Sequence, residues 1–225
     1  MNGQAWTFAV RQIVIPKEGN AQYECEDAVR ISLPKRRFCV ADGATEGFDS
    51  RRWAHTLVRH WTAASTPITT PELFEQWVSS IGERFQQRWQ GQQLSWYAQE
   101  KAEYGAFAAF VGLSFCEIQK HLYWNVIAMG DSCLFVRRKD QMVKSLPIDD
   151  PANFGNAPSL VASNRVVHQE PACNVFSDAV QNGDRFILLT DAIAAWYLRC
   201  FRTQSNEALI FEQLLANGCD EARGS

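Results

Sequence analysis

The segment from residue 104 to residue 136 constrains the fold more than any other part of the chain. It consists of three nearly continuous apolar runs, at residues 104–115, 121–129 and 133–136, separated by short turns. Aromatic and branched side chains dominate these runs, which is typical of strands in an antiparallel meander. Because the runs lack a polar face, we expect one side of the meander to pack on a second sheet and the other under helices.

The residues before the meander predict two helices that can supply this cover. Trp53, Leu57 and Trp61 recur at helical spacing in a segment that begins near residue 49. In the next segment, Thr70 can cap a helix whose first position suits Pro71, and an apolar stripe continues to residue 85. We expect the aromatic side chains of both stripes to lie in the core.

The remaining segments complete an α+β pattern. The other expected strands are at residues 6–15, 27–33, 38–41 and 185–190, and the other expected helices are at residues 192–199 and 205–215. Residues 140–180 contain several prolines and asparagines, and they predict an irregular insertion with short strands at residues 160–162 and 164–168. Strands, then helices, then further strands, with little strand–helix–strand alternation, indicate α+β layers.

The composition is that of a single domain without a polyelectrolyte partner. The chain has 225 residues, 46% of them hydrophobic, so one core can serve the whole of residues 1–225. Its net charge of -3 favours neither a nucleic acid nor an anionic membrane as a partner, and no apolar run is long enough to cross a bilayer. The seven cysteines lack zinc-site spacing and no signal peptide is evident, so we expect reduced thiols and a cytoplasmic protein.

Acidic residues stand at the ends of three expected strands. Asp42-Gly43 directly follows the run at residues 38–41, Asp191 directly follows the run at residues 186–190, and Glu26-Asp27 precedes a third run. Each motif alone is more often a turn or a helix cap. Together they form a set of like charges that repel one another unless they are protonated, solvated or bridged by a cation. A hard divalent ion such as Mg²⁺ or Mn²⁺ prefers oxygen ligands of this kind.

The order of these motifs resembles that of a known enzyme family. Glu-Asp before a strand, Val-Ala-Asp-Gly, Gly-Asp-Ser at residues 130–132 and Leu-Leu-Thr-Asp before a helix are together similar to the metal-dependent serine/threonine protein phosphatases of type 2C. The resemblance extends from about residue 6 to residue 215 and is greatest to compact bacterial members. It implies a four-layer α-β-β-α sandwich, in which two mostly antiparallel sheets are flanked by helices and the last strand of the family is missing.

The resemblance also implies a role for each acidic residue. Asp42 would bridge two metal ions, either Mg²⁺ or Mn²⁺, and the carbonyl of Gly43 would bind one of them. Asp191 would bind the other ion, Glu26 would act through a metal-bound water, and Asp27 would hydrogen-bond the water shell. A water activated by the two ions would hydrolyse phosphoserine and phosphothreonine in a phosphoprotein substrate.

Other positions are assigned no catalytic role. Asp131 and Asp184 are expected to be structural turn residues. None of the four histidines matches a family position, so no general acid is named. The sequence does not indicate an oligomeric state.

Three positions depart from the family pattern. Gln22 stands where many members have a phosphate-binding arginine, and Ala192 replaces the glycine after the late aspartate. The final pair of ligand residues is absent, because Asp220 and Glu221 directly follow the last expected helix and no strand follows them. We favour a fragment of a longer reading frame over a natural member with weakened metal binding.

Three interpretations remain open at this stage. The first is an active metal-dependent protein phosphatase. The second is a catalytically weak phosphatase-like module that binds a partner or regulates it. The third is an unrelated α+β protein whose acidic residues are caps and turns.

Overall fold

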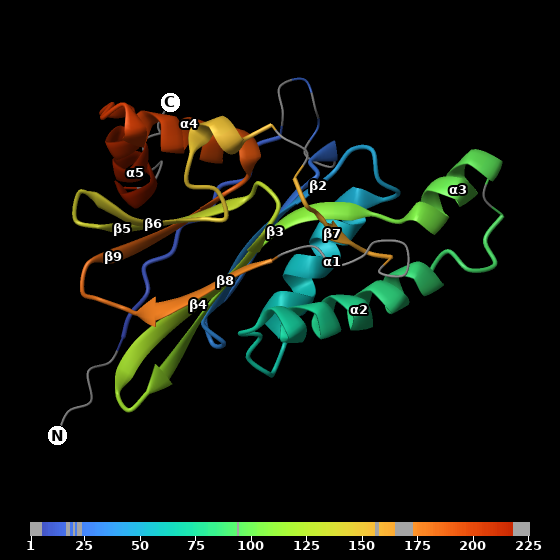
Figure 1. The fold of residues 1–225 in the computed structure, drawn as a ribbon, viewed down its shortest axis with the longest axis horizontal. Coiled ribbons are helices and arrows are strands. Elements are labelled where there is room, and N and C mark those ends of the chain that lie inside the picture. The colour runs from blue at the N-terminus through green and yellow to red at the C-terminus, as the bar shows by residue number, and fades with distance from the viewer. Residues whose placement is uncertain are drawn as a thin grey trace, which may run out of the picture.

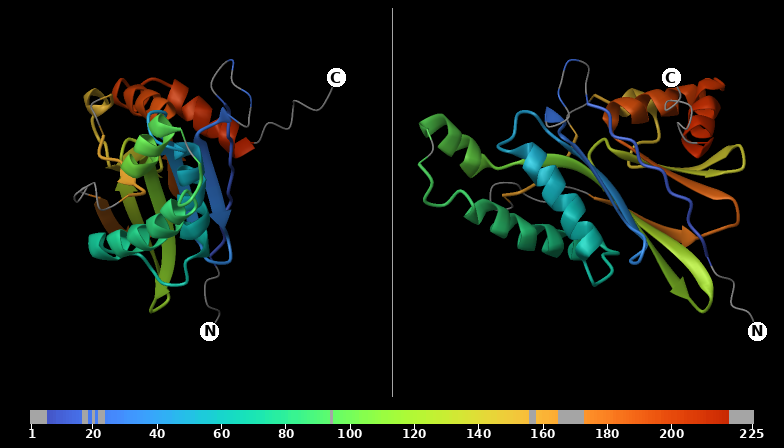
Figure 2. Two further views of the ribbon diagram at one scale, coloured as in Figure 1. Left: turned by 90° about the vertical axis from the view of Figure 1, so that its right-hand side faces the viewer. Right: turned by 180° about the vertical axis from the view of Figure 1, so that it is seen from behind.

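The computed structural model describes residues 6–16, 19, 21, 24–93, 95–155, 158–164 and 173–217. Two antiparallel sheets are stacked on each other, with helices on the outer face of each (Figure 1). The view from behind shows the helices α1 and α2 against one sheet and α4 and α5 beyond the other (Figure 2). The predicted α-β-β-α arrangement is therefore confirmed.

The described part of the chain forms one large and one small sheet. The strands of the large sheet, in spatial order, are β1 (Asp27–Ser32), β2 (Arg37–Gly43), β3 (Phe107–Ile118), β4 (His121–Met129) and β8 (Asn174–Ala179), and the short β7 (Val161–Ala162) pairs with β3. The order in the small sheet is β6 (Gln141–Leu146), β5 (Cys133–Arg138) and β9 (Asp184–Leu189). The helices are α1 (Ser50–Ala63), α2 (Pro71–Gln87), α3 (Trp96–Tyr104), α4 (Asp191–Arg202) and α5 (Glu207–Asn217), with a short 3-10 turn at Pro151–Asn153.

The central strand β3 is buried on both faces, as its sequence predicts. Phe110 lies in the core beneath α1 and α2, and its neighbour Val111 lies in the core between the two sheets. A third core joins the outer face of the small sheet to α4 and α5. The continuous apolar pattern therefore reflects alternate side chains that enter two different cores.

The two predicted helices on the large sheet form for the expected local reasons. Trp53, Leu57 and Trp61 of α1 are fully buried. At the start of α2, the side-chain oxygen of Thr70 accepts a hydrogen bond from the backbone N–H of Leu73 at 3.3 Å, and Pro71 occupies the first turn. No described helix is long and apolar enough to span a membrane.

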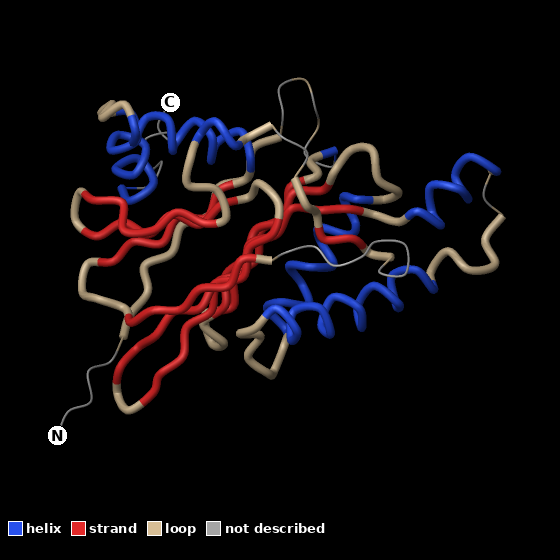
Figure 3. Tube along the Cα trace, viewed as in Figure 1, coloured by secondary structure: helices blue, strands red, loops and turns tan. Residues whose placement is uncertain are grey.

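The predicted strand at residues 6–15 is wrong. Residues 6–16 have no strand assignment, and Figure 3 draws this segment as loop where it is described. Its apolar side chains nevertheless pack between the sheets, because the ring of Phe8 lies 4.9 Å from that of Phe115 and 5.9 Å from that of Phe38. The apolar pattern of this segment therefore reflects the packing of its side chains in the core, and the segment is not paired with a strand.

The predicted irregular insertion at residues 140–180 is only partly correct. The strand β7 confirms the short strand expected near residue 161, but β6 and β8 are six-residue strands that extend the two sheets. Their polar, exposed positions made them resemble loops. Most of the strand expected at residues 164–168 lies outside the described residues.

The helix α3 is absent from the sequence-based expectations. Only Ala102 of its residues is buried, so no apolar stripe marks it. Its start is instead set by Ser95, whose side-chain oxygen accepts a hydrogen bond from the N–H of Ala98 at 3.3 Å.

Candidate functional site

The first pair of acidic residues faces each other across two strands. In the antiparallel register of β1 and β2, Asp27 is the direct partner of Asp42. Like charges at directly opposed positions destabilise a sheet. Burial, together with the negative charges of Asp27 and Asp42, raises the pKa of the nearby Cys25 thiol. The two carboxylates therefore form a local negative field at this end of the large sheet.

Gly43 brings the start of α1 directly onto this end of the sheet. A Cβ atom at Gly43 would lie 2.7 Å from both the carbonyl carbon and the carbonyl oxygen of Ser50. A side chain at this position would therefore collide with helix backbone. We expected glycine here so that the chain could approach a metal closely; the structure supplies a second reason, which is the packing of the helix.

Glu26 is held by the loop that follows β2. Its carboxylate oxygen Oε2 accepts a hydrogen bond from the Thr45 hydroxyl at 2.7 Å, and its backbone carbonyl accepts one from the N–H of Gly43 at 3.3 Å. These two contacts fix both the backbone and the side chain of Glu26 beside the first acidic pair.

A second pair of acidic residues lies at the end of the small sheet. Cys133 of β5 is paired with Leu189 of β9. Asp131 lies two residues before Cys133, and Asp191 lies two residues after Leu189, so the antiparallel register places both at the same end. Burial and then the charge of Asp191 raise the pKa of Asp131. We predicted Asp131 to be a structural turn residue; it lies in the bend between β4 and β5, and the structure also gives it a charged neighbour.

The strand ends that carry the two pairs adjoin each other. A Cβ atom at Gly130, next to Asp131, would lie 2.6 Å from the Cβ of Ala109. Ala109 is in turn the β3 partner of Asp42. The turn that carries Asp131 is therefore one strand away from Asp42.

The donor set is chemically suited to a hard cation. The five carboxylates described above and the carbonyl of Gly43 are oxygen donors of the kind that Mg²⁺ and Mn²⁺ prefer. Among the described residues, however, no group of three or more histidine, cysteine, aspartate or glutamate side chains is arranged to hold an ion. That Asp42, Gly43 and Asp191 bind ions, with Glu26 and Asp27 in the water shell, stays a prediction.

Comparison with protein families decides which fold family this is. The family model for protein phosphatase 2C matches residues 19–222. The chain belongs to the protein phosphatase 2C family.

Solved structures agree with this fold. The catalytic domain of the serine/threonine protein phosphatase PstP in complex with two manganese ions is 13% identical, with a TM-score of 0.55 over 81% of this chain and 80% of that one. The phosphatase MsPP from Mycobacterium smegmatis in complex with cacodylate is 16% identical, with a TM-score of 0.54 over 92% and 90%. PstP/Ppp from Mycobacterium tuberculosis is 13% identical, with a TM-score of 0.51 over 76% and 73%. No curated protein matches the chain.

In this protein phosphatase 2C chain, the structure also gives the contacts of Asp184, which was expected to be a turn residue, and of Asp191, which was expected to bind a metal ion. Asp184 has the expected structural role, because its carboxylate accepts hydrogen bonds from Arg138 Nε at 2.7 Å and Nη2 at 3.1 Å. Asp191 opens α4, and its side chain accepts a hydrogen bond from the N–H of Ala192, the residue that replaces the family glycine. Gln22, Asp220 and Glu221 lie outside the described residues.

Proposed function

We propose that this chain hydrolyses phosphoserine and phosphothreonine in proteins, with a water activated by two divalent ions, Mg²⁺ or Mn²⁺. The observation that carries the proposal is the pair of directly opposed aspartates, Asp27 and Asp42, in a member of the protein phosphatase 2C family. A bridging cation relieves the repulsion of such a pair, and the neighbouring strand end adds a second pair, Asp131 and Asp191.

Each residue of the site has a defined task in this proposal. Asp42, the carbonyl of Gly43 and Asp191 would hold the ions, which would supply an activated water. Asp27 and Glu26 orient the water molecules, and the Thr45 hydroxyl fixes the Glu26 carboxylate. When bound, the ions lower the pKa of a water and neutralise charge on the phosphoryl oxygens. The PstP structure with two manganese ions supports this choice of cation.

The second candidate is a catalytically weak module that binds phosphoproteins without turnover. It is favoured by one observation, which is that no group of three or more histidine, cysteine, aspartate or glutamate side chains among the described residues is arranged to hold an ion. Fold alone does not decide between the two, because activity resides in the site.

The deciding experiment measures hydrolysis of a chromogenic phosphomonoester with and without Mn²⁺. We expect turnover that a chelator abolishes and that Asp42→Asn lowers by at least about tenfold. Asp140→Asn is the matched control, because Asp140 is an exposed aspartate in the turn between β5 and β6. Absence of turnover at every Mn²⁺ concentration, with a phosphopeptide still bound, would establish the binding module instead.

A further inference from the structure

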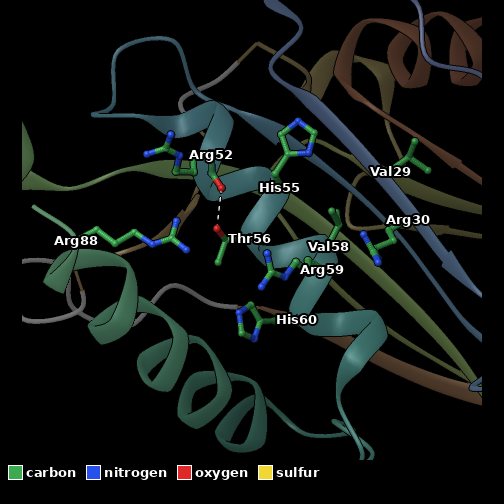
Figure 4. A pocket seen from close by; sticks show the side chains of 9 residues that line it. All are labelled: Val29, Arg30, Arg52, His55, Thr56, Val58, Arg59, His60 and Arg88. Carbon is green, nitrogen blue, oxygen red and sulfur yellow. Dashed lines mark hydrogen bonds between the residues drawn. The ribbon is translucent and has the colours of Figure 1, made fainter. Parts of the chain in front are cut away.

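A second charged feature lies on the opposite side of α1 from the core. It is a pocket of about 370 Å³ between α1, the residue that follows α2 and the edge strand β1 (Figure 4). The charged or titratable side chains that line it are Arg30, Arg52, Arg59, Arg88, His55 and His60. None of the described residues that line this arginine pocket is acidic.

The arginines come from three separate elements. Arg30 belongs to β1, Arg52 and Arg59 to α1, and Arg88 to the residue that follows α2. Within the described residues, the structure contains no ion pair for Arg30, Arg59 or Arg88. Like charges gathered by folding repel one another unless an anion lies between them. The chain as a whole carries a net charge of -3, so this cluster is not a consequence of a basic composition.

The positive charges at the start of α1 are unfavourable with respect to the helix dipole. Arg51 and Arg52 occupy its first turn, where the helix dipole favours acidic residues, and α1 contains no acidic residue at all. The residue before the helix, Asp49, has a left-handed backbone with φ 56° and makes no capping hydrogen bond with its side chain. The helix dipole therefore does not account for the positive charge of this turn, although Arg51 Nε donates a hydrogen bond to the carbonyl of Cys25 at 3.1 Å.

One arginine is held in place by its neighbours. Arg52 Nη1 lies 3.3 Å from Asp49 Oδ2, and its guanidinium carbon lies 5.6 Å from the ring centre of Trp89. Figure 4 shows Arg88 extending from the end of α2 toward α1, on the side where Arg59 also points. A guanidinium group can donate two parallel hydrogen bonds to phosphate oxygens. A cluster of arginines that is already partly ordered loses less conformational entropy when it binds a phosphate.

The two histidines are influenced by nearby arginines, two of which, Arg51 and Arg88, have Asp49 as an acidic neighbour. Burial and then Arg51 lower the pKa of His55, and burial followed by Arg59, Arg84 and Arg88 lowers that of His60. Both imidazoles are therefore neutral near pH 7 and add hydrogen-bonding groups without further charge.

We propose that the arginine pocket binds a second phosphate group on the same protein substrate whose first phosphate is hydrolysed at the acidic site. This rests on the proposed function and adds a substrate class to it. The start of α1 contacts Gly43, and Arg52 and Arg59 lie two and nine residues beyond Ser50. At 1.5 Å of rise per residue this places the pocket about 3–14 Å along the helix from the contact. An extended peptide covers that length in about one to four residues, so the preferred substrates carry two phosphates about one to four residues apart.

The test compares two peptides and one small substrate. The peptides carry one phosphoserine, or two phosphoserines four residues apart, and the small substrate is the chromogenic phosphomonoester. For the wild-type chain we expect a lower KM for the doubly phosphorylated peptide, and we expect added salt to remove this preference. In Arg59→Gln/Arg88→Gln, we expect the ratio of kcat/KM for the doubly phosphorylated peptide to kcat/KM for the small substrate to fall about tenfold. The fall should come from a higher KM for the peptide.

A matched control removes the same charge elsewhere. Lys120→Gln/Lys139→Gln changes two exposed lysines in the turns after β3 and β5, and should keep the preference. Arg59→Gln/Arg88→Gln should unfold at the same urea concentration as the wild type or at a higher one, because the loss of two positive charges relieves repulsion within the pocket. If Arg59→Gln/Arg88→Gln keeps the wild-type ratio of kcat/KM for the doubly phosphorylated peptide to kcat/KM for the small substrate, the proposal is overturned. The proposed phosphatase function would remain intact.

The pocket can be tested even without turnover. If no variant hydrolyses any substrate, the proposed function fails, and fluorescence anisotropy of the labelled peptides tests the pocket alone. The proposal is supported if the wild type binds the doubly phosphorylated peptide more tightly than the singly phosphorylated one and Arg59→Gln/Arg88→Gln loses this difference. Equal binding of both peptides, or stronger binding of a single-stranded oligonucleotide than of either, would overturn it.

Discussion

Asp27 and Asp42 are direct partners in the register of β1 and β2, so their side chains leave the sheet side by side. A sheet with this pair is less stable than one with a neutral pair. This loss of stability is confined to one end of the sheet. Hydrogen bonds hold Glu26, Gly43 and Thr45 at the same end. Such a local loss of stability is typical of a functional site.

Mn²⁺ should stabilise the folded chain through this pair. At 100 times its dissociation constant, a ligand that binds only the folded state adds about 2.7 kcal/mol to the free energy of unfolding. We expect a rise in the thermal midpoint of the wild type and of Asp140→Asn, and a much smaller rise for Asp42→Asn. Thermal unfolding with and without Mn²⁺ measures this. An equal rise in all three proteins would place the ion elsewhere.

Gly43→Ala should destabilise the fold. The added Cβ would lie 2.7 Å from backbone atoms of Ser50, and helix backbone cannot rotate away as a side chain can. Overpacking of this kind costs about 1–3 kcal/mol, and urea denaturation measures it. Ala44→Gly changes the next residue without adding an atom and serves as the control for local effects. A free energy of unfolding equal to that of the wild type would show that α1 shifts without cost.

Asp49→Asn should stabilise the fold at neutral pH. Burial raises the pKa of Asp49, so the folded state holds the proton more tightly than the unfolded state does. Its charged form therefore costs stability, and this cost appears as the pH rises above the ordinary pKa of aspartate. Asparagine also tolerates the left-handed backbone at φ 56°.

The expected gain is about 0.5 kcal/mol near pH 7, and it should shrink at about pH 3, where aspartate is protonated in both states. Urea denaturation of both proteins at the two pH values measures the difference. A gain that is larger at the lower pH would contradict the assigned cause. Arg52→Gln, which removes the ion pair at 3.3 Å, separates the contribution of that contact.

Glu212→Gln should be the most destabilising of these changes. Glu212 lies between α5 and the small sheet, where its carboxylate is 2.8 Å from Arg137 Nη1 and 3.0 Å from Arg185 Nη1. Arg137 is fully buried, so loss of its partner leaves a buried charge. Breaking such a pair costs about 3–5 kcal/mol.

Arg185→Gln is the matched comparison within the same network. The Arg185 side chain is 58% exposed, so its removal should cost less than about 1 kcal/mol. Chemical denaturation of both variants measures the two values. Equal costs would show that burial of Arg137 does not determine the effect.

Much of the fold follows from local sequence. The spacing of Trp53, Leu57 and Trp61 defines the buried face of α1, and Thr70 with Pro71 defines the start of α2. These signals depend on neighbours within one or two turns of helix, so the sequence suffices to read them. The doubly buried strand β3 was equally evident, because its apolar pattern is continuous.

The acidic residues could be recognised as a set, but their pairing could not be derived. Asp131 becomes the neighbour of Asp191 only through the register of β5 and β9, which joins residues far apart in the chain. The strands β6 and β8 were missed for the same reason, since a half-exposed polar strand is held by its partner and not by its own composition.

The sequence by itself determined the layers of the fold, the two helices over the large sheet and the identity of the acidic residues at the strand ends. The helices were marked by their apolar faces and by the cap of α2. Tertiary structure alone decided which acidic residues face each other and that Arg30, Arg59 and Arg88 line one pocket. The physical reason is range: helix periodicity and capping act within a few residues, whereas electrostatic neighbours are chosen by strand register and helix packing.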